Sequence, residues 1–140
     1  MKRVFIDTNV PMYWAGEDSQ YKSACGRILS AVASGEIEGV TDAEVLQEIL
    51  YRYSTIGKKE IGWKIFDGFH AVVDTILPVT EDDISLARHL QEQYDLRPRD
   101  LVHAAVMLNA GIKEICTVDR HFDRIAGISR IDPLHFYMPR

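Results

Sequence analysis

Short apolar runs alternate with amphipathic segments along the whole chain, and this alternation restricts the possible folds more than any other sequence feature. The first run, VFI at 4–6, has no polar interruption, which is typical of a strand buried on both faces of a parallel sheet. The predicted strands are 2–7, 39–41, 75–79, 114–118 and 128–131. Because helical segments separate them, the sequence predicts an α/β fold with a mainly parallel sheet and helices on both faces.

The segments between the strands contain residues that begin or end helices. In 19–34, apolar residues recur at intervals of three and four, and Gly35 ends the pattern. Pro11 suits the first turn of a short helix, and Pro98 opens a strongly apolar one. Pro78 lacks a backbone N–H, so it places the third strand at an edge of the sheet. The other predicted helices are 42–53, 58–73, 80–94 and 100–110, and no pattern assigns 135–140.

Composition favours one globular domain. The chain has 140 residues, and 46% of them are hydrophobic, so we expect a single domain over 1–140. The net charge of −5 argues against a general nucleic-acid coat protein but not against an enzyme with a local acidic site. Cys25 and Cys116 form no CxxC pair, and we expect both to be buried hydrophobic side chains. Asp7 interrupts the first apolar run far short of a signal peptide, and no stretch approaches a membrane span. We therefore expect a cytoplasmic protein.

Four carboxylates fall where a parallel α/β sheet places its ligands. Asp7 ends the first strand and Asp119 follows the fourth, and such sheets bind ligands beyond the carboxyl ends of their strands. Asp100 lies in the first turn of one predicted helix, and Glu48 lies in the middle of another. If all four converge, they repel one another unless a cation compensates. Oxygen-only ligands favour Mg²⁺ or Mn²⁺ as that cation.

Each carboxylate also has an interpretation without catalysis. Asp7 is able to form an Asx turn, and Asp119 is able to cap the helix after it. Asp100 complements the dipole of its own helix. Glu48 lies about 130° from the centre of the apolar stripe of its helix, whereas Glu44 lies about 170° away. Glu48 is therefore nearer the buried boundary, and Glu44 is the better candidate for a solvated residue.

Four segments together resemble the motifs of the PIN-domain ribonucleases. They match, in order, the family's opening strand with its Asp-x-Asn, its helical acidic residue, its third acidic motif and its Thr-x-Asp-x-x-Phe segment. Order and spacing agree from Val4 to about Ile131. The segments are VFIDTN at 4–9, EVLQEIL at 44–50, RDLVHAA at 99–105 and TVDRHF at 117–122. The short length resembles in particular the VapC-like toxins of type II toxin–antitoxin pairs.

The resemblance implies a fold, an activity and partners. The fold is a three-layer α/β/α sandwich with a five-stranded, mainly parallel sheet. The activity is that of a metal-dependent endoribonuclease, which hydrolyses RNA phosphodiester bonds with Mg²⁺ or Mn²⁺. The implied partners are an RNA substrate, a second copy in a homodimer, and a small antitoxin protein that covers the active site.

The resemblance assigns catalysis to the four carboxylates. We expect Asp7 and Asp119 to hold the principal metal ion, directly or through water, with Asp100 as a further ligand. Glu48 completes the ligand shell, positions water or helps to hold a second ion.

Three further residues are candidates for supporting those carboxylates. Asn9 and Thr117 are placed to donate orienting hydrogen bonds. Many relatives carry an additional acidic residue two positions after the last motif Asp, where this chain has His121. Asp123 lies one helical turn after Asp119 and is the candidate substitute.

Basic and aromatic residues suggest how RNA and partner proteins are bound. Four arginines near the last two motifs are candidates for phosphate contacts, and solvated surface charge is the alternative for each: Arg97, Arg99, Arg120 and Arg124. His103 lies among apolar neighbours, which favours a packed, hydrogen-bonded histidine over a ligand. Five aromatic residues are better candidates for core, dimer or antitoxin contacts than for base stacking: Tyr51, Tyr53, Trp63, Phe66 and Phe69.

Three other functions remain open at this point. One is a PIN nuclease that processes RNA without an antitoxin, and another is a PIN-fold binding module without activity. A phosphoaspartyl enzyme with Asp7 as nucleophile is the third. Asn9 weighs against it, because the haloacid-dehalogenase type usually carries Asp at that position.

Overall fold

One five-stranded parallel sheet forms the centre of the fold, in a computed structural model that describes residues 2–137. The strands are β1 (Lys2–Ile6), β2 (Ile37–Asp42), β3 (Thr75–Leu77), β4 (Glu114–Cys116) and β5 (Ser129–Ile131). Their order across the sheet is β3-β2-β1-β4-β5, and all four neighbouring pairs are parallel. The predicted α/β class and mainly parallel sheet are confirmed.

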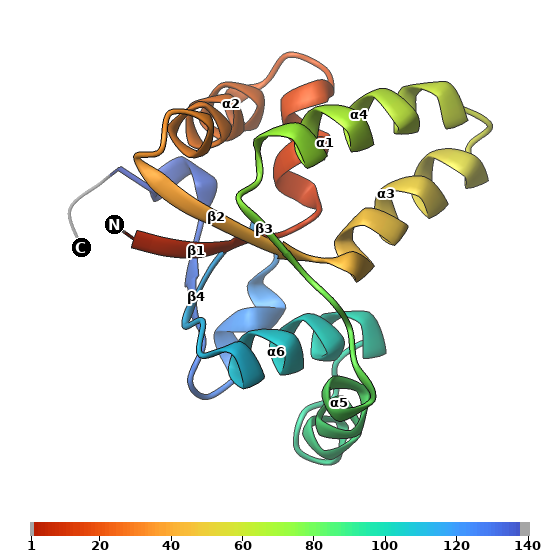
Figure 1. The fold of residues 1–140 in the computed structure, drawn as a ribbon, viewed down its shortest axis with the longest axis vertical. Coiled ribbons are helices and arrows are strands. Elements are labelled where there is room, and N and C mark those ends of the chain that lie inside the picture. The colour runs from red at the N-terminus through yellow and green to blue at the C-terminus, as the bar shows by residue number, and fades with distance from the viewer. Residues whose placement is uncertain (1, 138–140) are drawn as a thin grey trace.

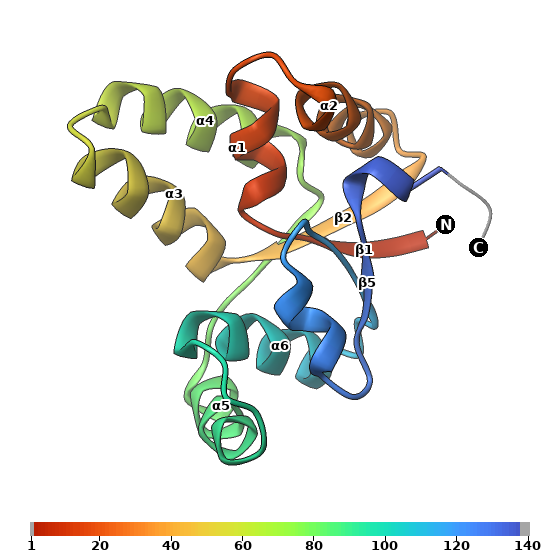
Figure 2. The same ribbon diagram turned by 180° about the vertical axis from the view of Figure 1, so that it is seen from behind.

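Helices cover both faces of this sheet and complete the predicted three layers. The α-helices are α1 (Asn9–Ala15), α2 (Gln20–Ala33), α3 (Ala43–Thr55), α4 (Lys59–Val72), α5 (Glu81–Gln93) and α6 (Pro98–Ala110). The short 3-10 helices are η1 (Arg120–Arg124) and η2 (Pro133–His135). Figure 1 shows α1 to α4 on one side of the sheet and α5 and α6 on the other, and Figure 2 shows the same arrangement from behind. None of the helices within residues 2–137 is long and apolar enough to cross a membrane.

β1 is the central strand and lies in the core. Val4, Phe5 and Ile6 are fully buried, as their uninterrupted apolar run predicts. Phe5 pairs with Val40 of β2 on one side and with Ile115 of β4 on the other. The end of β1 is therefore fixed between two neighbours, and the residue that follows it occupies a defined position.

Strands β2 and β4 end at residues other than those predicted, next to polar residues that turn toward the candidate site. β2 extends to Asp42, which also caps α3 by accepting a 2.9 Å hydrogen bond from the N–H of Val45. β4 ends at Cys116, before Thr117 and its neighbour enter the site loop. β3 ends before Pro78 and lies at a sheet edge, as the proline predicts.

The two helices between β3 and β4 begin and end at the residues that the sequence indicates. Thr80 and Asp83 form a reciprocal capping box at the start of α5, in which each side chain bonds the backbone N–H of the other. Pro98 occupies the first turn of α6. Gly111 ends that helix with φ of 73°, a left-handed conformation that favours glycine.

The five aromatic residues between 51 and 69 divide between core and surface. Phe69 is fully buried, whereas Tyr51 and Trp63 are about half exposed. Tyr53 and Phe66 pack against the core from its margin. Cys25 and Cys116 are buried free thiols, as expected.

Candidate active site

Asp7 and Asp119 lie at the carboxyl edge of the sheet, next to the boundary between β1 and β4. Asp7 directly follows β1, and its backbone N–H donates a 3.2 Å hydrogen bond to the carbonyl of Cys116 at the end of β4. The chain proceeds from β1 toward one edge of the sheet and from β4 toward the other. Such a switch point is where open α/β sheets bind ligands.

A hydroxyl group and an amide hold the Asp7 carboxylate. Thr117 Oγ1 donates to Asp7 Oδ2 at 2.8 Å, and Asn9 Nδ2 donates to the same oxygen at 3.3 Å. Thr117 Oγ1 also accepts from Asn9 Nδ2 at 2.8 Å and from the N–H of Asp119 at 3.0 Å. Because a hydroxyl has one proton and two lone pairs, these contacts direct its proton to Asp7. Thr117 thus links two of the predicted metal ligands.

Burial raises the pKa of Asp7 above its usual range. The positive charge of His103 and the hydrogen bonds from Thr117 and Thr8 oppose this increase, and the charge of Glu48 adds to it. A positive ion beside Asp7 would favour its ionised form.

Glu48 is buried on α3 with 8% of its surface exposed, as the helical wheel predicts. Glu44 was expected to be solvated but is half-buried, because it pairs with Arg99. Thr8 Oγ1 donates to Glu48 Oε1 at 3.0 Å, and Arg52 Nε lies 3.4 Å from Oε2. Burial alone would raise the pKa of Glu48. His103, Thr8 and the charge of Arg99 outweigh burial and lower that pKa, so Glu48 is ionised at neutral pH.

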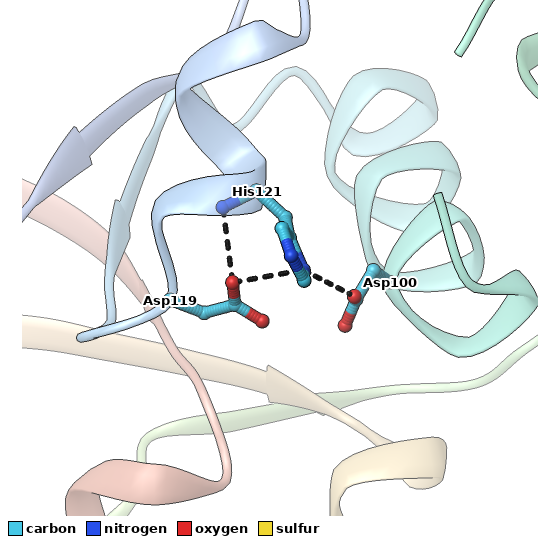
Figure 3. Close-up of side chains that lie close together, drawn as sticks. All are labelled: Asp100, Asp119 and His121. Carbon is cyan, nitrogen blue, oxygen red and sulfur yellow. Dashed lines mark hydrogen bonds and ion pairs between the residues drawn. The ribbon is translucent and has the colours of Figure 1, made fainter. Parts of the chain in front are cut away.

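Asp100, Asp119 and His121 form a compact group with three potential metal-binding atoms (Figure 3). His121 Nδ1 lies 3.0 Å from Asp119 Oδ1 and 3.4 Å from Asp100 Oδ2. One ligand atom from each residue lies within 4.8 Å of the other two. Two carboxylates and an imidazole are donors that divalent metal ions accept, so these residues fit a cation. His121 was not among the residues predicted for the site, although its place two residues after Asp119, at a helix start, is the signal for this contact.

All four predicted carboxylates line one cavity of about 780 Å³. Asp7 and Asp119 follow β1 and β4, whereas Asp100 comes from α6 and Glu48 from α3. The lining continues over α1 and the loop after it, and its other members are Thr8, Asn9, Met12, Tyr13, Gly16, Glu17, Asp18, Ser19, Arg52, Tyr53, Arg97, Val118 and His121. The cavity therefore joins an acidic centre to a wall with aromatic and polar side chains.

The sequence profile of the PIN domain matches residues 4–128. The chain belongs to the PIN-domain family. The match includes every one of the four carboxylates and Thr117, so the family's core and this cavity are the same part of the chain.

The relatives of this PIN domain include mycobacterial VapC ribonucleases. Ribonuclease VapC13 of Mycobacterium tuberculosis is 40% identical over 129 residues, covering 91% of this chain and 98% of the relative. Ribonuclease VapC23 of the same species is 32% identical over 117 residues, covering 83% of this chain and 92% of the relative.

Solved structures of toxin–antitoxin proteins share the fold. VapBC2 from Rickettsia felis, bound to a DNA fragment from its promoter, superposes with a TM-score of 0.74 at 18% identity and covers 92% of this chain and 97% of the solved chain. VapC20 of Mycobacterium tuberculosis, a sarcin–ricin loop cleaving toxin, gives 0.69 at 18% identity, with 84% and 90% coverage.

Two of the four predicted RNA-binding arginines contact the acidic residues of this PIN domain. Arg97 Nε lies 3.4 Å from Asp100 Oδ2, and its Nη2 lies 3.5 Å from Asp119 Oδ2. Arg99 pairs with Glu44 at 3.3 Å and reaches Glu48 at 3.8 Å. Both arginines thus compensate negative charge within the site.

Five of the predicted residues lie outside the lining of the cavity, among them Arg99 and Thr117. Arg120 and Arg124 are exposed on η1. The Asp123 carboxylate is half exposed and pairs with Arg130 Nε at 2.9 Å. In the described part of the chain, His121 rather than Asp123 joins Asp119 and Asp100.

His103 lies beneath the site and is almost fully buried on α6. Its Nδ1 lies 2.7 Å from Asp42 Oδ2, as expected of a hydrogen-bonded core histidine. Its Nε2 has no hydrogen-bond partner within residues 2–137 and lies 4.0 Å from Glu48 Oε1. Burial lowers the pKa of His103, but Asp42, Glu48 and Asp7 outweigh it and hold that pKa well above its usual range. We therefore expect His103 to carry its proton beneath the site.

Proposed function

We propose that this protein is an endoribonuclease that hydrolyses RNA phosphodiester bonds with a divalent metal ion, as the toxin of a toxin–antitoxin pair. The observation that carries the proposal is the convergence of four carboxylates on one cavity. Membership of the PIN family and 40% identity to a ribonuclease over nearly the full length of both chains support the same activity.

Asp7, Asp100 and Asp119 would hold Mg²⁺ or Mn²⁺. When bound, such an ion lowers the pKa of a coordinated water and neutralises charge on the phosphate. Thr117 and Asn9 keep the Asp7 carboxylate in place through the hydrogen bonds described above. Their role is therefore to orient a metal ligand without contacting the ion.

Glu48 is the candidate for handling the attacking water. Its low pKa keeps it ionised, so it is able to accept a hydrogen bond from water and orient its lone pair toward phosphorus. Thr8 and Arg52 hold the carboxylate from either side. Asp123 would support the metal-binding carboxylates only if η1 shifts, because its carboxylate pairs with Arg130.

Arginines would supply the phosphate contacts that an acidic protein requires. Arg97 has 64% of its side chain exposed while it contacts two site carboxylates, so it is able to turn from them to an incoming phosphate. Arg99 borders Glu48. Arg120 and Arg124 lie farther along η1 and would extend the contacts to neighbouring phosphates.

The partners that we propose are a second copy of the chain and a small antitoxin, in the cytoplasm. Structures with the same fold include toxin–antitoxin complexes. The exposed side chains of Tyr51 and Trp63 on α3 and α4 are suited to a protein contact, because aromatic residues are enriched at interfaces.

The test is cleavage of a mixed RNA pool by purified wild-type protein and by Asp7→Asn. We expect fragments with Mn²⁺ or Mg²⁺, none with a chelator, and none from the folded variant. His89→Ala, on the exposed surface of α5, is the control and should cleave like wild type. Cleavage by Asp7→Asn at the wild-type rate would refute the proposed site. Failure of folded, partner-free protein to cleave with either ion would favour a binding module.

A further inference from the structure

We propose that His121 is a nitrogen ligand of the metal site and that it makes the site prefer a divalent transition-metal ion, such as Mn²⁺, over Mg²⁺. The inference rests on the proposed function and specifies the cofactor of the same site. Its starting point is the group in Figure 3, in which two carboxylates and one imidazole converge.

The local backbone fixes the imidazole at this place. Asp119 caps η1, and its Oδ1 accepts a 2.9 Å hydrogen bond from the backbone N–H of His121. The ring Nδ1 of His121 lies 3.0 Å from that same oxygen. With the backbone anchored, only the two side-chain torsions remain for the ring to search. The cap of η1 therefore brings a nitrogen donor to the carboxylate that ends the preceding strand.

The ring also reaches the second carboxylate, which comes from another helix. Asp100 lies in the first turn of α6, and its Oδ2 is 3.4 Å from His121 Nδ1. The three side chains thus come from two elements that meet at the edge of the cavity. His121 has 45% of its side chain exposed, so its ring is accessible to an ion that enters from the cavity.

The donor set discriminates between ions. Mg²⁺ demands oxygen ligands and keeps several of its waters, whereas imidazole nitrogen is a ligand for first-row transition metals. A site with two carboxylates and one imidazole is therefore matched to an ion that accepts both oxygen and nitrogen. Mn²⁺ accepts carboxylate ligands readily. Its unpaired electrons couple to the nucleus of a coordinated nitrogen, so its resonance spectrum reports nitrogen coordination.

The competing interpretation is that protonated His121 only compensates the two carboxylates. An imidazolium has no free lone pair and is unable to bind an ion. Arg97 already contacts both carboxylates, at 3.4 and 3.5 Å, so the pair has one cationic partner without His121. Direct observation of the Mn²⁺ ligands separates the two interpretations.

The first experiment is pulsed electron paramagnetic resonance of Mn²⁺ bound to full-length protein labelled with ¹⁵N-histidine. We expect a ¹⁵N hyperfine coupling in wild type and in His89→Ala, and its loss in His121→Ala with Mn²⁺ still bound. Bound Mn²⁺ without a nitrogen coupling in wild type, or a coupling that persists in His121→Ala, would overturn the proposal.

The second experiment measures the choice of ion without any RNA. Mg²⁺ is titrated against bound Mn²⁺, and released Mn²⁺ is measured by its resonance signal. In His121→Asp, which restores an oxygen ligand, we expect the preference for Mn²⁺ over Mg²⁺ to fall by about tenfold or more. An unchanged preference would contradict the proposal.

These outcomes are distinct from a failure of the proposed function. RNA cleavage together with Mn²⁺ that lacks a nitrogen ligand would overturn only the role of His121. A nitrogen-bound Mn²⁺ in a protein that cleaves no RNA would overturn the nuclease function and leave the metal site. A protein that binds no Mn²⁺ would overturn the role of His121, and one that binds neither Mn²⁺ nor Mg²⁺ would also overturn the metal dependence.

Discussion

Thr117 shows how one buried hydroxyl organises a charged site. It accepts two hydrogen bonds from Asn9 and the backbone of Asp119, which leaves its proton for Asp7. Removing the hydroxyl leaves a buried carboxylate with a weaker set of donors, and buried acceptors without partners are costly. The effect should therefore be larger on catalysis than on the stability of the fold.

The corresponding prediction is that Thr117→Val lowers RNA cleavage by about 10- to 100-fold and lowers the free energy of unfolding by about 1–3 kcal/mol. Thr41→Val is the matched control, because Thr41 is also fully buried and its hydroxyl donates to the carbonyl of Ile6 at 3.0 Å. Urea unfolding and cleavage rates measure the two effects. Equal loss of cleavage in both variants would show that the Thr117 hydroxyl acts through stability alone.

His103 makes the stability of the protein depend on pH. Asp42, Glu48 and Asp7 raise its pKa in the folded protein well above the unfolded value, which is about 6.5. The folded chain therefore binds this proton more tightly than the unfolded chain. The stabilisation is complete below the unfolded pKa and is lost as the pH rises through the folded pKa.

We predict that wild-type protein loses thermal stability from neutral to alkaline pH more steeply than His103→Gln. The measurement is the melting temperature as a function of pH without added metal. Nitrogen chemical shifts of the labelled imidazole provide an independent check, and they should show both ring nitrogens protonated at pH 7. A neutral His103 at pH 7 would contradict the assignment of a buried cation.

Many residues of the site are recognisable individually in the sequence, but the contacts that compensate their charges are not. The carboxylates at the strand ends and the polar residues beside them were recognisable from their positions, as with Asp7 and Thr117. The contact between His103 and Asp42 joins residues 61 positions apart, and local spacing carries no signal for it. His121 was recognisable as a departure from the family pattern, whereas its approach to Asp100 depends on how η1 meets α6.

At the scale of elements, the packing of α3 against α4 fixes the position of Glu48. A Cβ added at Gly62 of α4 would lie 2.7 Å from the Cβ of Tyr53 on α3. This distance is shorter than a van der Waals contact, so the two helices approach closely because Gly62 has no side chain. Glu48 and Arg52 lie on the same helix as Tyr53, so a shift of α3 changes the site.

Gly62→Ala should therefore separate the two helices and destabilise the fold by about 1–3 kcal/mol, the usual cost of overpacking. Gly68→Ala on the same helix is the control, since its new Cβ would meet the Trp14 ring at an ordinary 3.5 Å. It should gain up to about 1 kcal/mol from the helix propensity of alanine. Chemical denaturation measures both, and equal changes would disprove the close helix contact.

Element boundaries were predictable where a side chain dictates them. Pro98, Gly111 and the Thr80 cap act through the backbone within one turn, so their helices begin and end as expected. The ends of β2 and β4 were not predictable, because pairing with neighbouring strands decides how far a strand continues. Asp42 is both the last residue of β2 and the cap of α3. The sequence pattern predicted only its place at the start of the helix.

At the scale of the whole molecule, the proposed metal binding would be coupled to folding. The carboxylates of the cavity come from distant parts of the chain and meet only in the folded state. An ion bound there stabilises the fold according to its concentration relative to Kd. The ion would also relieve the repulsion from Glu48, whose charge adds to the raised pKa of Asp7.

We predict that Mn²⁺ at about 100 times its Kd stabilises the protein by about 2.7 kcal/mol, a rise in melting temperature of roughly 5–10 °C for a domain of this size. Asp119→Asn should abolish the rise while keeping the cap of η1, because asparagine caps helices as well as aspartate does. Asp67→Asn, on the exposed surface of α4, should retain it. Differential scanning calorimetry with Mn²⁺ and with a chelator measures each shift. An equal rise in Asp119→Asn and wild type would place the ion at another site, because the charge removed at Asp119 belongs to the group that meets His121 and Asp100.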